Sequence, residues 1–336
     1  MIQDVHPFLA DIWFWLLGFI LMLYVVLDGF TLGTGVISLF AKSEEQRDIM
    51  MNSLGSVWDA NETWLVVFGG ALFGAFPAVY GIILHGLYIP IMLMIFALIF
   101  RGVAFEFREH GRHKRRWNMA FGLGSIGAAA TQGLALGALL GGIPVDGLSF
   151  SGSVWHWLHP FAVLTAAGVV FGYTLLGATY LVIKTEDALQ RQARRIAWWA
   201  GWLTVVAGIG VSVWTPLRFD YVAQRWLDWP DMAWLAPLPI IAGACFFMLL
   251  RGLRCGFERS PFFWSVGIFV ASLVGLGVSI HPYLVPPEVT VVDAASESKT
   301  LVFMLTGIGI LIPIMMVYNG YQYLVFRGKA KAHEGY

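Results

Sequence analysis

Nine apolar stretches, each long enough to cross a lipid bilayer, make up most of this 336-residue sequence. A membrane-spanning helix needs about 20 mostly apolar residues. Hydrophobic residues form 58% of the chain and charged residues only 12%, which excludes a water-soluble enzyme built around one large core. We therefore predict an all-α integral membrane protein, with one polytopic domain over residues 1–336. The nine predicted spans are residues 8–40, 54–76, 78–100, 117–140, 158–183, 196–214, 236–253, 262–280 and 301–326.

The distribution of positive charge predicts how these spans cross the membrane. Of the 21 Lys and Arg residues, 18 follow odd-numbered spans, and only Arg218, Arg225 and Lys299 lie on the other side. Cytoplasmic loops carry an excess of Lys and Arg, so we expect the N-terminus outside and the C-terminus in the cytoplasm. The net charge of zero argues against nucleic acid as a partner.

Three carboxylates lie inside this apolar sequence: Asp28 in the first span, and Asp59 and Glu62 in the second. A charged group at the centre of a bilayer costs about 2.5–3.5 kcal/mol on insertion scales. Three such groups in the first two spans therefore indicate a function. The candidates are proton or cation handling, or a buried contact with a charged partner.

Asp59 and Glu62 are three positions apart, so they share one face of a helix. Counted from residue 54, they lie about 8–12 Å into the second span at the rise of an α-helix. Burial favours the protonated form of a carboxyl group, which would allow proton exchange near neutral pH. We predict a proton-uptake path open to the cytoplasm; a structural ion pair or hydrogen bond between helices is the alternative. The predicted site residues are Asp59, Glu62 and Asp28, supported by Trp58, Asn61 and Ser56.

Glycines indicate two places of close helix packing. Gly133, Gly137 and Gly141 recur at four-residue intervals in the fourth span and form a stripe that a neighbouring backbone can approach. Packing within the chain is the simpler explanation, and a surface for another subunit is the alternative. The glycine-rich segment after Asp28 has no preceding strand and no Lys-Ser/Thr pair, so it is not a phosphate-binding loop. We expect it to pack against the second span.

The histidines offer no convincing haem site. Haem iron needs an axial ligand, and of the eight histidines only His85 lies well inside a predicted span. A lone intramembrane histidine is more often a structural residue, so we predict no haem or metal in this chain. Arg101, Glu106, Arg108 and Glu109 are expected to form a solvated charged face where the third span leaves the membrane.

Taken in order, these features resemble subunit II of the cytochrome bd-type quinol oxidases over essentially the whole chain. The most specific match is residues 58–65, with the sequence WDANETWL, together with the glycine-rich stretch that follows. The other matching segments are residues 27–30 with Gly33 and Gly35, residues 47–53, Arg101 with residues 105–108, residues 177–180 with Lys184 and Thr185, and residues 318–323. The compact outer loops are similar to those of the cyanide-insensitive branch.

The resemblance implies a partner, subunit I, that carries haems b and d and the quinol site. Together the two subunits would oxidise quinol and reduce O2 to water in the bacterial inner membrane. Protons taken from the cytoplasm, through the position that matches Asp59, would make turnover electrogenic; proton pumping does not follow from these residues. The implied fold is two four-helix bundles plus a peripheral helix, which agrees with nine spans. Some members carry a second Asp where this chain has Thr31, so any role of that carboxylate does not carry over.

Other possibilities stay open at this point. The resemblance leaves open a small single-helix subunit, and a structural quinone or lipid bound to this chain. An ion- or proton-coupled secondary transporter would also bury carboxylates, although inverted repeats with interrupted helices are not evident. A scaffold subunit without any proton role is the third possibility. A haem-bearing partner that co-purifies would favour the oxidase, whereas a colourless homomeric protein would favour the transporter.

Overall fold

The computed structural model describes residues 6–55, 57–108, 111, 113–229 and 231–331, and nearly all of its regular structure is helical. The long helices are α1 (Pro7–Ser38), α3 (Trp58–Ala75), α5 (Tyr88–Phe107), α6 (Lys114–Leu140), α7 (Pro160–Lys184), α8 (Asp187–Arg218), α11 (Pro237–Arg254), α12 (Ser260–Ile280) and α14 (Ser298–Val325). The short helices are α2 (Glu44–Asn52), α4 (Pro77–Gly86), α9 (Asp220–Leu227), α10 (Asp231–Leu235) and α13 (Val291–Ala294). Two antiparallel hairpins pair β1 (Val145–Asp146) with β2 (Ser149–Phe150), and β3 (Tyr283–Val285) with β4 (Val289–Thr290).

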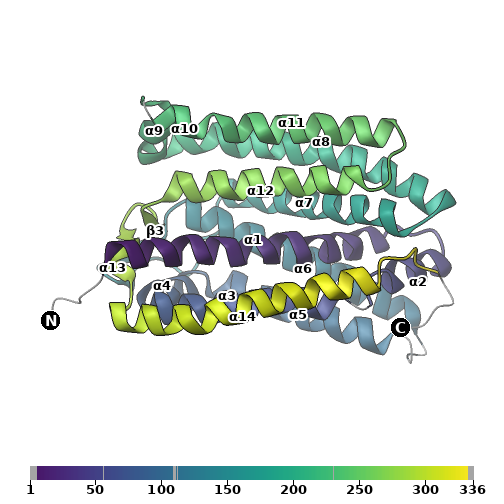
Figure 1. Cartoon of the computed structure of the whole chain (residues 1–336), viewed down its shortest axis with the longest axis horizontal. Coiled ribbons are helices and arrows are strands. Elements are labelled where there is room, and N and C mark those ends of the chain that lie inside the picture. The colour runs from purple at the N-terminus through teal and green to yellow at the C-terminus, as the bar shows by residue number, and fades with distance from the viewer. Residues whose placement is uncertain (1–5, 56, 109–110, 112, 230, 332–336) are drawn as a thin grey trace.

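The long helices lie side by side along the longest axis of the molecule (Figure 1). Helix α1 packs against α3, α6 and α7, while α7 also packs against α8 and α12. The helix α1 begins at one end of the molecule, where α9, α10 and α13 gather, and α14 ends at the opposite end (Figure 1). Short connections therefore lie at the two ends, and the apolar helices form the body.

Eight of the described helices are long and apolar enough to cross a membrane, which confirms a helical, multi-pass membrane protein. They are α1, α5, α6, α7, α8, α11, α12 and α14. Helix α3 is not among them, because Asp59, Asn61 and Glu62 lie in its first turns and lower its hydropathy. The ninth span, the grouping into two bundles plus a peripheral helix, and the orientation of the termini stay predictions.

The third predicted span, residues 78–100, is placed wrongly along the chain. The structure breaks this stretch at Leu87, whose φ of −104° and ψ of 25° are not helical, and the crossing helix is α5. Pro90 is the third residue of α5. A proline clashes with the carbonyl four residues earlier in a continuous helix, so α4 ends before it. His85 consequently lies in the last turn of α4, with its ring centroid 5.1 Å from that of Phe150 in β2, and not inside a span.

Small residues set the closest helix contacts. A Cβ added at Gly133 would lie 2.5 Å from the Cα of Ala166, and one at Gly137 would lie 2.5 Å from the Cα of Ala162. The stripe on α6 thus packs against α7 of the same chain, as the simpler explanation predicted. The segment after Asp28 packs differently from expectation, because a Cβ at Gly33 would lie 1.7 Å from the carbonyl oxygen of Tyr173. Its glycines face α7 and α6 instead of the second predicted span.

Helix α14 lies along one side of the molecule, on α3 and α1 (Figure 1). Only 11% of its most apolar stretch is buried, the smallest share among the eight candidate spans. Its buried residues include Leu301, Ile312 and Asn319. A helix that is apolar on nearly all sides and so little buried is suited to lipid or to another membrane protein.

Candidate functional site

A buried arginine joins two of the three predicted carboxylates. Arg101 of α5 forms an ion pair with Glu62 of α3 through Nη1, and its Nη2 lies 3.4 Å from Oδ1 of Asp28 in α1. The side chains of Asp28 and Arg101 are 0% and 1% exposed, whereas that of Glu62 is 24% exposed. Three helices that are far apart in sequence therefore meet at one charged cluster, the Asp28–Arg101–Glu62 cluster.

The surroundings of Arg101 hold the guanidinium in place. Its Nη2 donates to the hydroxyl of Thr31 over 2.7 Å, and that hydroxyl in turn lies 2.8 Å from the carbonyl oxygen of Asp28. The guanidinium carbon lies 5.8 Å from the ring centroid of Trp58 and 5.9 Å from that of Phe121, a cation–π geometry. Trp58 and Phe121 thus pack against the guanidinium of the cluster.

The expectation that Arg101 belongs to a solvated face is wrong. Because α5 extends to Phe107, Arg101 lies within the helix and is buried in the molecule. Attraction to the two carboxylates offsets the free-energy cost of removing its charge from water. Glu106 is exposed, as expected, and Glu109 lies outside the described residues. Sequence spacing alone could not find this pairing, since Asp28, Glu62 and Arg101 come from three separate helices.

Asp59 does not join the cluster. Helix α3 begins at Trp58, not at residue 54, so Asp59 lies in its first turn. The residue is exposed on the surface of this chain. A carboxylate in the first turn of a helix is favoured by the helix dipole, which is a structural reason for Asp59. The predicted supporting residue Ser56 lies outside the described residues.

Asn61 ties three helices together next to the cluster. Its amide nitrogen donates to the carbonyl of Leu27 in α1 over 2.9 Å, and its amide oxygen accepts from the hydroxyl of Tyr323 in α14 over 2.8 Å. Asn61 is 1% exposed. Its hydrogen bonds are therefore structural links from α3 to α1 and to α14.

A second polar chain lies one turn of α1 away from Asp28. Gln132 of α6 donates to the hydroxyl of Tyr24 over 2.6 Å and accepts from the hydroxyl of Tyr173 in α7 over 2.7 Å. Sequence analysis placed Arg101 in solvent and assigned neither Thr31 nor these three residues to the site. The signal that could have found Tyr24 is its position four residues before Asp28, on the same helical face.

Another buried arginine organises the end of the molecule where α2 lies. Arg108 is 4% exposed, its Nη1 lies 2.6 Å from Oδ1 of Asp48, and its Nε donates to Asn118 over 2.5 Å. Arg108 was also expected to be solvated, and this expectation is wrong. Burial by itself would raise the pKa of Glu44, but the hydrogen bond from Asn118 and the charges of Arg47 and Arg108 hold it below its ordinary value. These contacts fix α2 to the ends of α5 and α6.

Metal-binding groups are not evident in the part of the chain that the structure describes. No three or more His, Cys, Asp or Glu side chains gather there in a way that could hold a metal ion. His85, the one histidine considered as a haem ligand, lies beside Phe150 in the last turn of α4, with the two rings tilted by 51°.

Comparisons with known proteins agree with this architecture. Residues 9–326 match the family model of cytochrome bd terminal oxidase subunit II. The chain is 29% identical to cytochrome bd-I ubiquinol oxidase subunit 2 of Escherichia coli, covering 96% of each protein, and 28% identical to a probable cytochrome oxidase subunit 2 of Haemophilus influenzae, covering 98% of this chain and 97% of the relative. It is also 27% identical to cytochrome bd ubiquinol oxidase subunit 2 of Bacillus subtilis, covering 97% of this chain and 98% of that protein.

A solved structure has the same fold. The bd oxidase from Geobacillus thermodenitrificans superposes with a TM-score of 0.74, covering 92% of this chain and 97% of the matched chain at 19% identity. The resemblance inferred from the sequence motifs is confirmed, and an ion-coupled transporter is not favoured. With a family match over nearly its whole length and the same helical fold, this chain belongs to the cytochrome bd terminal oxidase subunit II family.

Proposed function

We propose that this chain is the non-haem subunit of a bd-type quinol oxidase in the bacterial inner membrane. A subunit I that carries haems b and d would oxidise quinol and reduce O2 to water. This chain would stabilise the complex and supply a path for protons from the cytoplasm. Relatives that are named as ubiquinol oxidase subunits support the assignment.

The Asp28–Arg101–Glu62 cluster is the observation that carries the proton path. One guanidinium faces two carboxylates, so the cluster is neutral only when the two carboxylates hold one proton between them. A net charge is costly inside a bilayer, and a nearby like charge disfavours the ionised form of a carboxylate. The shared proton can sit on either carboxylate, which suits a proton relay. A fixed ion pair of one Arg and one carboxylate would hold no such proton.

The exposure of the carboxylates gives the relay a direction. Asp59 is exposed, Glu62 is 24% exposed and Asp28 is fully buried. The Oδ2 atom of Asp28 has no hydrogen-bond partner among the described residues, so it is available to accept a proton or a water molecule. A proton would enter near Asp59, pass to Glu62 and reach Asp28 beside Arg101.

The exposed position of Asp59 also supports a partner in the membrane. An isolated carboxylate is not stable against lipid, and the neighbouring surfaces of α3 and α14 expose Val66, Phe73, Val317 and Tyr321. Subunit I would cover this face and bring polar groups to Asp59. In this arrangement α3 also crosses the membrane and brings the number of spans to nine. Helix α14 is the peripheral helix beside two four-helix bundles, and the N-terminus is outside.

The first prediction concerns Asp59→Asn, which keeps the shape of the side chain but removes its exchangeable proton. Proton transfer by a positioned group typically contributes about 10²–10⁴-fold to a rate, so quinol-dependent O2 uptake per haem should fall at least about tenfold. Assembly and haem content should stay near those of the unaltered complex. Glu62→Gln should reduce uptake by the same factor or less, because water and Asp59 can partly substitute.

Oxygen uptake per haem in the purified complexes checks this prediction. Glu288→Gln, in the loop between β3 and β4, is the matched control and should change nothing. Normal uptake per haem in the Asp59→Asn complex would remove this residue from the path. A complex that falls apart or loses haem, while the surviving molecules turn over normally, would assign Asp59 to the scaffold instead.

The second prediction concerns cofactor content. This chain produced without subunit I should bind no haem, because its described residues offer no axial histidine pair inside the spans. The reduced-minus-oxidised absorption spectrum of the purified chain should be flat. A stoichiometric haem band would contradict the assignment of the haems to subunit I, and a His85→Ala variant would then test the first ligand.

A further inference from the structure

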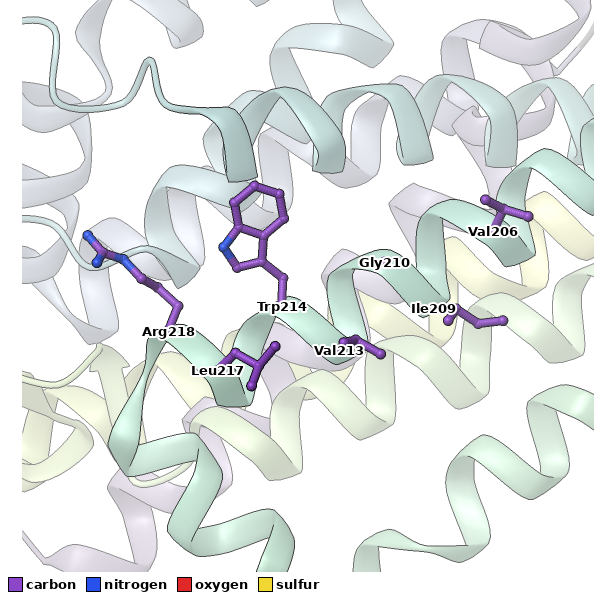
Figure 2. A pocket seen from close by; sticks show the side chains of 7 residues that line it. All are labelled: Val206, Ile209, Gly210, Val213, Trp214, Leu217 and Arg218. Atoms are coloured by element: carbon purple, nitrogen blue, oxygen red, sulfur yellow. The ribbon is translucent and has the colours of Figure 1, made fainter.

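A shallow apolar groove runs along the outer side of α8 (Figure 2). Its volume is about 540 Å³, and every residue that lines it belongs to this one helix. The lining residues are Val206, Ile209, Gly210, Val213, Trp214, Leu217 and Arg218. Their spacing places them along one stripe of the helix. Gly210 lies at the edge of that stripe toward α7, because a Cβ added there would lie 3.3 Å from Cδ2 of Leu164.

One end of the groove is basic and aromatic. Arg218 is exposed, and none of the side chains that the structure describes forms an ion pair or hydrogen bond with it. Trp214 lies one turn before it and points away from the helix toward α7 (Figure 2). Tryptophan is enriched at the interface between the bilayer and water, and arginine near the end of a span extends its charge toward that interface.

A second hollow lies close to the same end. It has a volume of about 380 Å³ and is lined by Leu158, His159, Pro160 and Val163, where α7 begins. The ring centroid of Phe161, at the start of α7, lies 6.1 Å from that of Trp214, so the two hollows are neighbours. Arg218 is the charged residue at this end, and none of the described residues that line the two hollows is a carboxylate.

The length of the groove matches one leaflet of a membrane. From Arg218 to Val206 there are twelve residues, which is about 18 Å along a helix. Half of the hydrocarbon core of a typical bilayer is about 15 Å thick. An acyl chain whose headgroup lies level with Arg218 would therefore reach about as far as Val206.

We propose that this groove binds one anionic phospholipid, with its phosphate on Arg218 and an acyl chain along Val206, Ile209 and Val213. The second hollow suits the other acyl chain. The positive charge of Arg218, together with described lining residues that include no carboxylate, selects a lipid with an anionic headgroup over a zwitterionic one. This proposal does not depend on the proton path.

Native mass spectrometry of the purified, delipidated complex tests the proposal. Phosphatidylglycerol and phosphatidylcholine with identical acyl chains are titrated separately onto the complex. We expect one phosphatidylglycerol to bind in preference to phosphatidylcholine, and Arg218→Gln to weaken that binding about tenfold, the effect of losing one charge-assisted contact. Ile209→Trp, which fills the groove and leaves Arg218 unchanged, should weaken it to a similar extent, because Ile209 is 58% exposed and tolerates a larger side chain.

Arg225→Gln is the matched control, since Arg225 is another basic residue at the same end of the molecule and does not line the groove. It should leave binding unchanged. Equal loss in Arg218→Gln and Arg225→Gln would mean that general surface charge attracts the lipid, and would overturn the site. Equal affinity for the two lipids, or unchanged phosphatidylglycerol binding in Arg218→Gln, would overturn it as well.

Discussion

Arg101→Gln is expected to destabilise the protein by about 3–5 kcal/mol, the range for a buried ion pair that loses one partner. The substitution leaves Asp28 fully buried with no cation beside it, and it also removes the hydrogen bond to Thr31. The yield of assembled complex and the midpoint of thermal unfolding in detergent should both fall sharply. Arg251→Gln, which alters an exposed arginine on α11, is the control and should stay within about 0.5 kcal/mol of the original protein.

A second substitution separates charge from packing in this result. Adding Asp28→Asn to Arg101→Gln removes the unpaired charge, so part of the lost stability should return, and the two changes should be strongly non-additive. Equal destabilisation in the single and double variants would show that Arg101 acts mainly by filling space beside Trp58 and Phe121. Wild-type stability of Arg101→Gln would contradict the charged cluster itself.

Gly33→Ala is expected to prevent α1 and α7 from packing at their present distance. The added Cβ would lie 1.7 Å from the carbonyl oxygen of Tyr173 and 3.0 Å from the amide nitrogen of Gly177, and backbone atoms cannot move aside as a side chain does. Overpacking typically costs about 1–3 kcal/mol and occasionally more, and we expect about 3 kcal/mol or more here because the clash is with backbone. Fluorescence-detected size-exclusion chromatography would report the loss of monodisperse protein.

The same helix supplies the control for this glycine. Gly18 also lies in α1, but a Cβ added there would meet nothing within 4 Å. Alanine is favoured over glycine in a helix interior by about 1 kcal/mol, so Gly18→Ala should be neutral or slightly stabilising. Loss of folded protein in both variants would point to a general sensitivity of α1, whereas normal folding of Gly33→Ala would contradict the close contact with α7.

The sequence determined the class of the protein because hydropathy is a local property. Each apolar stretch can be recognised without knowledge of its neighbours, and the family motifs lie on continuous segments such as residues 58–65. The close packing on the stripe from Gly133 to Gly141 could also be predicted, since the four-residue spacing is a property of one helix. The errors in the span boundaries fell where the chain departs from a regular span, at the break before α5 and at the start of α3.

Tertiary structure decided which polar groups meet. The sequence singled out Asp28, Asp59 and Glu62 as unusual for a membrane span, but it grouped Asp59 with Glu62 and left Arg101 in solvent. The folded chain instead joins Asp28 and Glu62 through Arg101 and leaves Asp59 on the surface. The physical reason is that periodicity fixes which face of a helix a side chain occupies, whereas the helix that this face meets depends on packing between residues far apart in sequence.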